Sequence, residues 1–211
     1  MNVDLDLLVR TFVIGVVVAA PVGAMGVLCI QRVLAHGWSA GLATGAGIAT
    51  ADAVYASLAA FGLTAVSTWI IDYQARLRVV GGMALIYLGW RAMVKPPSNR
   101  AATAADSPRF LPLYSSALGL TLTNPMTIMA FAAVFASAGL VAAAGVSSAL
   151  TVTFGVACGS LAWWLTLTTV VWAVRHAVSD RAMVWVNRVS GGVIMVFGLL
   201  AIVTGVQGLI D

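Results

Sequence analysis

Asp52 is the side chain in this sequence that is best suited to proton or cation chemistry. It lies in the apolar stretch AGIATADAVYAS, and no basic residue is expected at a similar membrane depth. A charge there costs at least about 2.5–3.5 kcal/mol on insertion scales. Without a cationic partner, such a carboxylate is expected to bind a proton or a cationic ligand, for example an ammonium group. The alternative is an aspartic acid that stays protonated and bonds a neighbouring backbone group.

Two apolar segments are interrupted by proline beside small or polar residues. Pro21 and Gly23 belong to APVGAMG, whereas Asn124, Pro125 and Thr127 belong to TNPMT. Proline removes a backbone hydrogen bond and glycine tolerates the unwound geometry. Such breaks are tolerated at membrane depth where protein or a water-filled cavity satisfies the freed groups. Together they predict a shared cavity where N–H groups at a half-helix end could hold a carboxylate; the alternative is two structural kinks.

Aromatic residues are weaker candidates for this cavity. Tyr55 follows Asp52 by three residues, on nearly the same helix face. Trp163 and Trp164 lie in a later apolar segment and could also line the cavity. Aromatic side chains in a membrane bundle more often serve packing, so these three remain secondary.

Two other functions are open alternatives. Cys29 and Cys158 motivate a membrane thiol-redox electron carrier, although neither lies in a CxxC motif. An inorganic-cation exporter would need more oxygen or thiolate ligands than Asp52, Asn124 and the two cysteines provide. We expect no metal site and no cofactor, and the absence of a glycine-rich phosphate loop argues against ATP as the energy source.

The composition predicts an all-α integral membrane protein. Apolar residues make up 61% of the chain and charged residues 9%, against about 25% charged in a typical globular domain. Long uncharged runs are typical of membrane-spanning helices. We expect six transmembrane helices, at residues 8–30, 38–66, 76–94, 111–138, 147–173 and 188–209.

The basic residues predict the orientation of these spans in the inner membrane. The connections after the first, third and fifth spans hold eight Lys and Arg residues, including Arg32, and the opposite side holds three, including Arg78. Positive residues accumulate on the cytoplasmic side, so both termini are expected outward. No Lys/Arg cluster suggests a nucleic-acid partner.

Similar segments recur along the chain in the same order. RVVGGMALIYLG starts at Arg78 and RVSGGVIMVFG at Arg188, GLATG is followed by GVACG, and Pro21 by Pro125, at offsets of 110, 114 and 104 residues. A duplicated three-helix unit enters the membrane inverted the second time. The sequence therefore predicts two inverted repeats, 1–94 and 112–211, joined by a cytoplasmic linker at 95–111. Chance recurrence of small packing residues is the alternative.

Inverted repeats are a signature of secondary transporters, with the substrate site at the midplane between them. The expected partners are a small-molecule substrate, protons and membrane lipid. The glycine pairs could pack within one subunit or between two copies, which leaves a homodimer open.

The stretches APVGAMG, GLATGAGIATADAVYAS, LRVVGGMALIYLGWRAM and LGLTLTNPMTIMAF resemble the LysE-type amino-acid exporters, the LysE/RhtB family. The resemblance covers about residues 10 to 209. It implies a six-helix inner-membrane translocator that exports amino acids or similar small metabolites, by antiport with protons.

By position, the resemblance assigns Pro21 and Gly23 to the family's first signature. It assigns Asp52 to the aspartate of the lysine-exporter-like branch, and Asn124 with Pro125 to the second signature. The chain departs from the family in two places. Ala24 stands where a second proline is frequent, which is expected to soften the helix break, and Met126 replaces a frequent lysine that could have held a substrate carboxylate. These departures leave the substrate open.

Overall fold

The computed structural model describes residues 4–20, 23–61, 64–94, 110–124, 127, 130–131, 145–175 and 180–210. This part of the chain is helical and contains no strand, which confirms the predicted all-α class. The helices are α1 (Leu5–Ala19), α2 (Ala24–His36), α3 (Trp38–Ala60), α4 (Thr64–Val94), α5 (Phe110–Leu122), α7 (Val146–Val174) and α8 (Asp180–Ile210).

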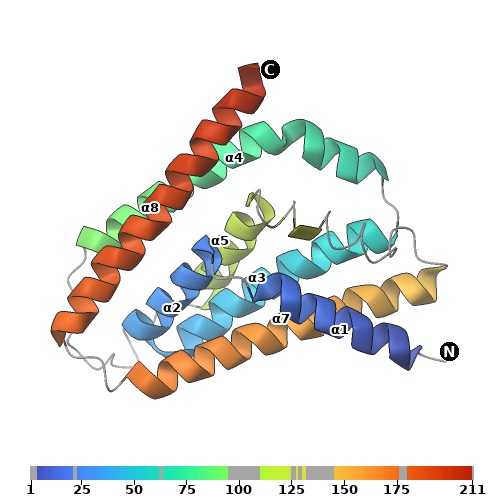
Figure 1. The fold of residues 1–211 in the computed structure, drawn as a ribbon, viewed down its shortest axis with the longest axis horizontal. Helices are drawn as coiled ribbons and strands as arrows, with labels where there is room; N and C mark the ends of the chain where they lie inside the picture. The colour runs from blue at the N-terminus through green and yellow to red at the C-terminus, as the bar shows by residue number, and fades with distance from the viewer. Residues whose placement is uncertain are drawn as a thin grey trace.

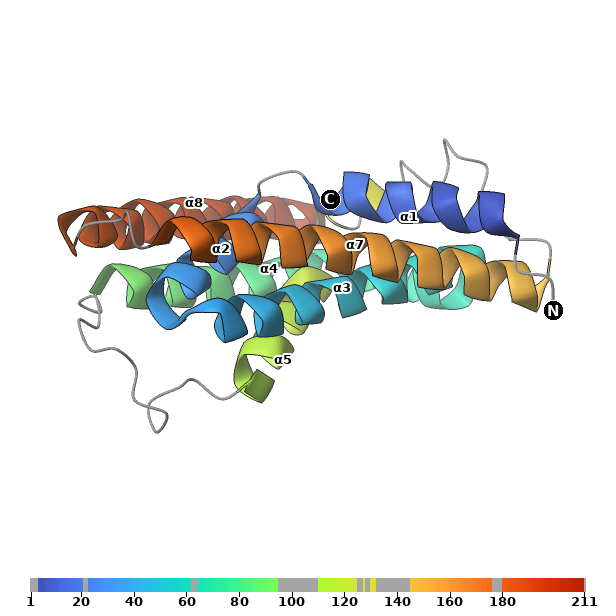
Figure 2. The same ribbon diagram turned by 90° about the horizontal axis from the view of Figure 1, so that it is seen from below.

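The helices pack as a flattened bundle. α4 and α8 lie side by side along one edge, whereas α1 and α3 both pack along α7 (Figure 1). α5 packs against α3, and α2 contacts α3, α7 and α8. The turned view in Figure 2 shows α3, α7 and α8 running lengthwise through this bundle.

Reciprocal glycine contacts hold α4 and α8 together. Gly82 meets the carbonyl group of Gly198, and Gly89 meets that of Gly191. A Cβ atom added to any of the four glycines would lie 2.5–2.7 Å from the partner's carbonyl oxygen. Both helices use glycines seven residues apart, and an offset of 109 residues relates the two sets. Small residues allow this close approach of two membrane helices.

The first expected helix break is present between α1 and α2. α1 ends at Ala19, α2 begins at Ala24, and the two helices are bent by 79°. Gly23 precedes α2 in an extended conformation, and Pro21 lies outside the described residues. Ala24 is the first residue of α2, directly after this break.

The second expected break is present at the end of α5. α5 ends at Leu122, and Pro125 lies outside the described residues. The N–H group of Asn124 donates to the carbonyl of Thr121, and that of Thr127 donates to the carbonyl of Asn124, both at 3.1 Å. These three-residue bonds replace the four-residue bonds of an α-helix.

The second and third expected spans left a connection at residues 67–75. That prediction is wrong, because this segment is helical. α3 ends at Ala60 and α4 already begins at Thr64. A helix also accommodates charges in or beside this segment where they face solvent or a neighbouring ring. The Arg76 guanidinium, for example, lies over the ring of Tyr73, 5.0 Å from its centroid.

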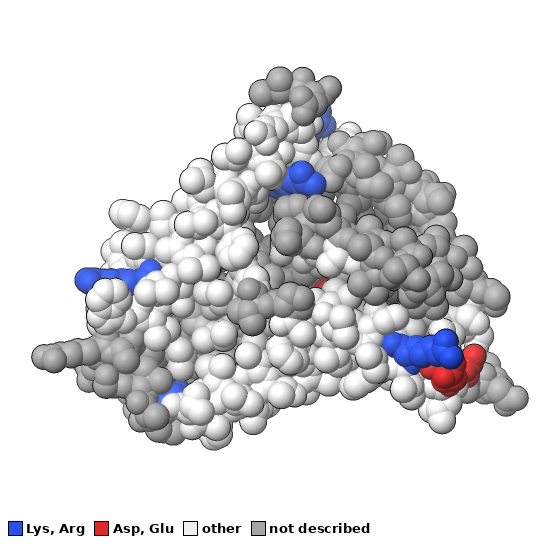
Figure 3. Space-filling view, viewed as in Figure 1, with Lys and Arg blue, Asp and Glu red and all other residues white. Residues whose placement is uncertain are grey.

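Two described helices are long and apolar enough to cross a membrane, namely α7 and residues Val184–Leu209 of α8. The bent pair α1 and α2 makes a third span if it is counted as one. Exposed apolar side chains such as Val13, Phe154 and Val196 face outward from these helices, and the face in Figure 3 shows few charged atoms among the described residues. Such surfaces suit lipid rather than water, as expected of a multi-pass membrane protein.

Candidate functional site

A cavity of about 500 Å³ lies within the bundle, and all seven described helices contribute to its wall. Figure 3 shows a hollow in the middle of the viewed face, with a small acidic surface inside it. The volume lies within the range of about 300–1,000 Å³ that is usual for small-molecule sites. Much of the wall is apolar, including Val18, Ile48, Leu85, Leu120, Phe197 and Leu200. A small set of polar groups therefore determines what it can bind.

Asp52 lies in the wall of this cavity, on α3. The residue is 3% exposed, and its Oδ2 accepts a hydrogen bond of 2.6 Å from the hydroxyl of Ser160 on α7. Ser160 itself is fully buried. A carboxylate offers about four acceptor positions, so this bond leaves capacity for a proton or a cationic group from the cavity.

The two broken helices meet at the same cavity. Gly23 lines it from the first break, and Asn124 with Thr127 lines it from the second. Gly23 offers no side-chain cap to α2. The positive end of the α2 dipole therefore borders the cavity together with its first N–H groups. The cavity expected between the two breaks is present.

Tyr55 does not belong to the cavity wall. Its hydroxyl donates a hydrogen bond of 2.6 Å to the carbonyl of Leu122, the last residue of α5. Its ring also packs against Phe131, with 5.6 Å between the centroids. The bond gives the carbonyl at the end of α5 a side-chain partner, so Tyr55 supports the second break.

Arg78 lines the cavity together with Asp52. The sequence did not predict Arg78 as a site residue. The expectation that no basic residue lies at a comparable depth is therefore wrong, although Arg78 does fall within the third expected span, 76–94. α4 continues through this position, and Gly81, one turn later, packs directly against Thr123 at the second break. The repeated RV-GG motif contained a signal for this residue, although its counterpart Arg188 is exposed.

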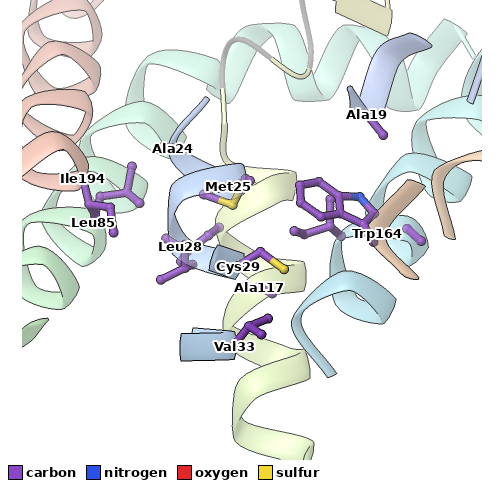
Figure 4. Close-up of a cluster of buried hydrophobic side chains, with 13 residues drawn as sticks. Ala19, Ala24, Met25, Leu28, Cys29, Val33, Leu85, Ala117, Trp164 and Ile194 are labelled. Carbon is purple, nitrogen blue, oxygen red and sulfur yellow. The ribbon is translucent and has the colours of Figure 1, made fainter. Parts of the chain in front are cut away.

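Trp164 also lines the cavity, which the sequence had indicated only as one of two possible roles. It is 3% exposed, and its indole N–H has no hydrogen-bond partner among the described residues. Figure 4 shows it in a cluster that includes Met25 and Cys29 of α2. Gly45 permits this position, because a Cβ atom there would lie 2.6 Å from the Trp164 Cβ. The adjacent Trp163 is partly buried and is not part of the wall.

Arg32 is buried in α2, so its expected place in a loop is wrong. Its guanidinium donates to the Thr44 hydroxyl at 3.1 Å, to the Leu113 carbonyl at 3.0 Å and to the Ser116 hydroxyl at 2.9 Å. These neutral acceptors replace water around the buried charge. Because α2 extends to His36, this arginine links α2 to α3 and α5.

The cysteines take no part in the cavity wall. Cys29 is buried, and its Sγ lies 3.8 Å from the Thr168 hydroxyl oxygen. Cys158 is partly exposed on α7. Neither forms a disulfide, and the described residues contain no group of three His, Cys, Asp or Glu side chains suited to a metal ion. This geometry gives the redox and metal hypotheses no support.

Comparison with known proteins places this geometry in context. The family described as LysE type translocator matches residues 16–205. The "Uncharacterized membrane protein YahN" of Escherichia coli (strain K12) is 31% identical over 188 residues, which cover 87% of this chain and 83% of the relative. The "Putative amino acid efflux protein YcgF" of Bacillus subtilis (strain 168) is 22% identical over 210 residues, which cover 98% of this chain and 100% of the relative. No solved structure gives a significant match.

Proposed function

Since the chain belongs to the LysE type translocator family, we propose that it exports amino acids or similar small metabolites across the inner membrane in exchange for protons. The observation that carries this proposal is the buried carboxylate of Asp52 in a cavity bordered by two broken helices. The printed name of the B. subtilis relative, an amino acid efflux protein, supports amino acids as the substrate class.

Asp52 couples the two fluxes by binding either a proton or a substrate ammonium group. Ser160 occupies one position on the carboxylate, and the remaining acceptor positions serve the exchanging partner. A bound ammonium favours the ionised carboxylate, whereas its departure from a poorly solvated cavity favours protonation. Because the two occupants compete, the substrate leaves the cell as protons enter.

We place this site at the midplane between two inverted three-helix repeats, residues 1–94 and 112–211, joined by a linker at 95–111. The glycine contacts support this arrangement, because a two-fold axis that relates Gly82 to Gly191 and Gly89 to Gly198 produces both observed pairs. The packing of α1 along α7 and of α5 along α3 follows the same symmetry. Broken helices at the repeat interface are typical of secondary transporters.

Both termini face outward in this proposal. Removing the buried Arg32 and the cavity-lining Arg78 from the counts leaves seven basic residues on the proposed cytoplasmic side and two on the other. The bias toward the cytoplasmic side is retained after the correction.

Proton flux in proteoliposomes tests the proposed function. A panel of amino acids is added to vesicles that contain a pH-sensitive dye and either the wild type, Asp52→Asn or Asp6→Asn. We expect Asp52→Asn to abolish amino-acid-driven proton movement, because the amide cannot exchange a proton. Asp6→Asn is the matched control, since Asp6 is exposed and pairs with Arg10 at 2.8 Å. Wild-type vesicles that move no amino acid, or an Asp52→Asn variant with wild-type flux, would contradict the proposal.

A further inference from the structure

We infer that Arg78 and Trp164 bind the carboxylate of the substrate while Asp52 binds its ammonium group. The substrate is then an α-amino acid whose side chain is uncharged and mainly apolar. This inference rests on the proposed function and adds to it a substrate class and two specificity-determining residues.

Arg78 supplies the cation that the cavity needs for a carboxylate. Its guanidinium is planar and permanently charged, and it matches a carboxylate with two parallel hydrogen bonds. The position lies in the cavity wall, beside the helix break where Gly81 packs against Thr123.

Trp164 supplies a second hydrogen-bond donor at the cavity wall. Indole nitrogen is a donor only, and that of Trp164 is buried in the cavity wall without a partner among the described residues. A buried donor without an acceptor is destabilising. A substrate carboxylate would accept this bond, and the positive end of α2, which starts beside Gly23 in the same wall, favours a negative charge there.

The charges of the wall indicate the substrate class. Among the described wall residues, Asp52 is the one acidic side chain and Arg78 the one basic side chain. A zwitterionic amino acid uses both charges, whereas the extra ammonium of a cationic side chain would be desolvated without a partner. The remaining wall is largely apolar, with Ile48, Leu85 and Phe197 among its larger side chains, which suits an aliphatic or thioether side chain.

Competition binding separates the two ends of the substrate. We would measure the affinity of purified protein for L-leucine and for L-leucinol, which keeps the amine and side chain but lacks the carboxylate. Arg78→Gln is expected to weaken leucine binding about 10-fold to 100-fold, the usual effect of losing hydrogen bonds to a charged group, and to leave leucinol binding unchanged. Arg188→Gln is the matched control, because Arg188 occupies the equivalent motif position but is exposed.

Trp164→Phe tests the second donor with the aromatic ring retained. We expect leucine affinity to fall about tenfold and leucinol affinity to stay unchanged. Trp163→Phe, which removes an indole N–H outside the cavity wall, is expected to bind both compounds like the wild type. If Arg78→Gln fails to fold, Trp164→Phe still tests the inference, because it keeps the aromatic ring.

The outcomes distinguish this inference from the proposed function. Wild-type transport of L-leucine and L-methionine in preference to L-lysine and L-glutamate supports the inference. Preferred transport of lysine or glutamate overturns it and leaves amino-acid export intact. Equal weakening of leucine and leucinol binding by both variants also overturns it, since a structural defect affects both compounds. A wild type that transports no amino acid defeats the proposed function itself.

Discussion

Asp52 of α3 and Ser160 of α7 form a buried hydrogen bond of 2.6 Å between two residues that are 108 positions apart in the sequence. The bond joins the two helices that carry the glycine motifs of the first and second half of the chain. It also holds the carboxylate in a defined orientation at the cavity wall. The proposed exchange of proton and substrate therefore depends on packing between the two halves.

Ser160→Ala is expected to lower amino-acid-driven proton flux about tenfold. The variant removes a hydrogen bond to a buried carboxylate, and such bonds to charged groups contribute about 1.5–3 kcal/mol. Flux in proteoliposomes measures the effect. Ser57→Ala is the control, because the Ser57 hydroxyl bonds the Val54 carbonyl within its own helix. Equal flux in both variants would show that Ser160 does not orient Asp52.

Tyr55→Phe is expected to lower stability by about 1 kcal/mol, the usual contribution of one hydrogen bond, and to leave substrate affinity close to that of the wild type. The variant loses the bond to the Leu122 carbonyl but keeps the ring that packs against Phe131. Thermal unfolding in detergent and leucine binding measure the two effects. Tyr87→Phe, at an exposed position on α4, is the control. A large loss of affinity without a loss of stability would instead assign Tyr55 to the substrate site.

Gly191→Ala and Gly192→Ala are expected to differ sharply, although the two glycines are neighbours. A Cβ atom at Gly191 would lie 2.6 Å from the Gly89 carbonyl oxygen, whereas one at Gly192 meets no atom within 4 Å. Overpacking of this kind costs about 1–3 kcal/mol, while alanine in an open helical position stabilises by up to about 1 kcal/mol relative to glycine. Thermal unfolding in detergent should show a lower Tm for the first variant alone. Equal Tm values would argue against the close α4–α8 contact.

Features with a local cause could be predicted from the sequence. The breaks after α1 and α5 follow from proline and glycine within apolar segments, and the membrane class follows from composition. Asp52 was predictable as a candidate, because a single acidic residue within an apolar helix needs a partner or a function. Loop positions were less predictable, since residues 67–75 belong to α4 rather than to a connection.

Partners across the bundle depended on the tertiary structure. Nothing in the sequence linked Asp52 to Ser160, Tyr55 to the Leu122 carbonyl, or Arg32 to acceptors on α3 and α5. Each of these contacts joins helices whose relative rotation is set by many packed side chains. Local preferences decide where a helix begins and ends, but they do not decide which of its faces meets a given neighbour.

Arg78 and Arg188 show this limit most clearly. They occupy the same place in the repeated RV-GG motif, yet Arg78 lines the cavity and Arg188 is exposed. Trp163 and Trp164 are likewise adjacent, and only the second lines the cavity wall. The sequence determined the residue types, the helices and their breaks, because these depend on neighbours along the chain. The tertiary structure decided which charge and which indole meet Asp52 in one cavity, because that depends on the contacts of α4 and α7 with helices distant in sequence.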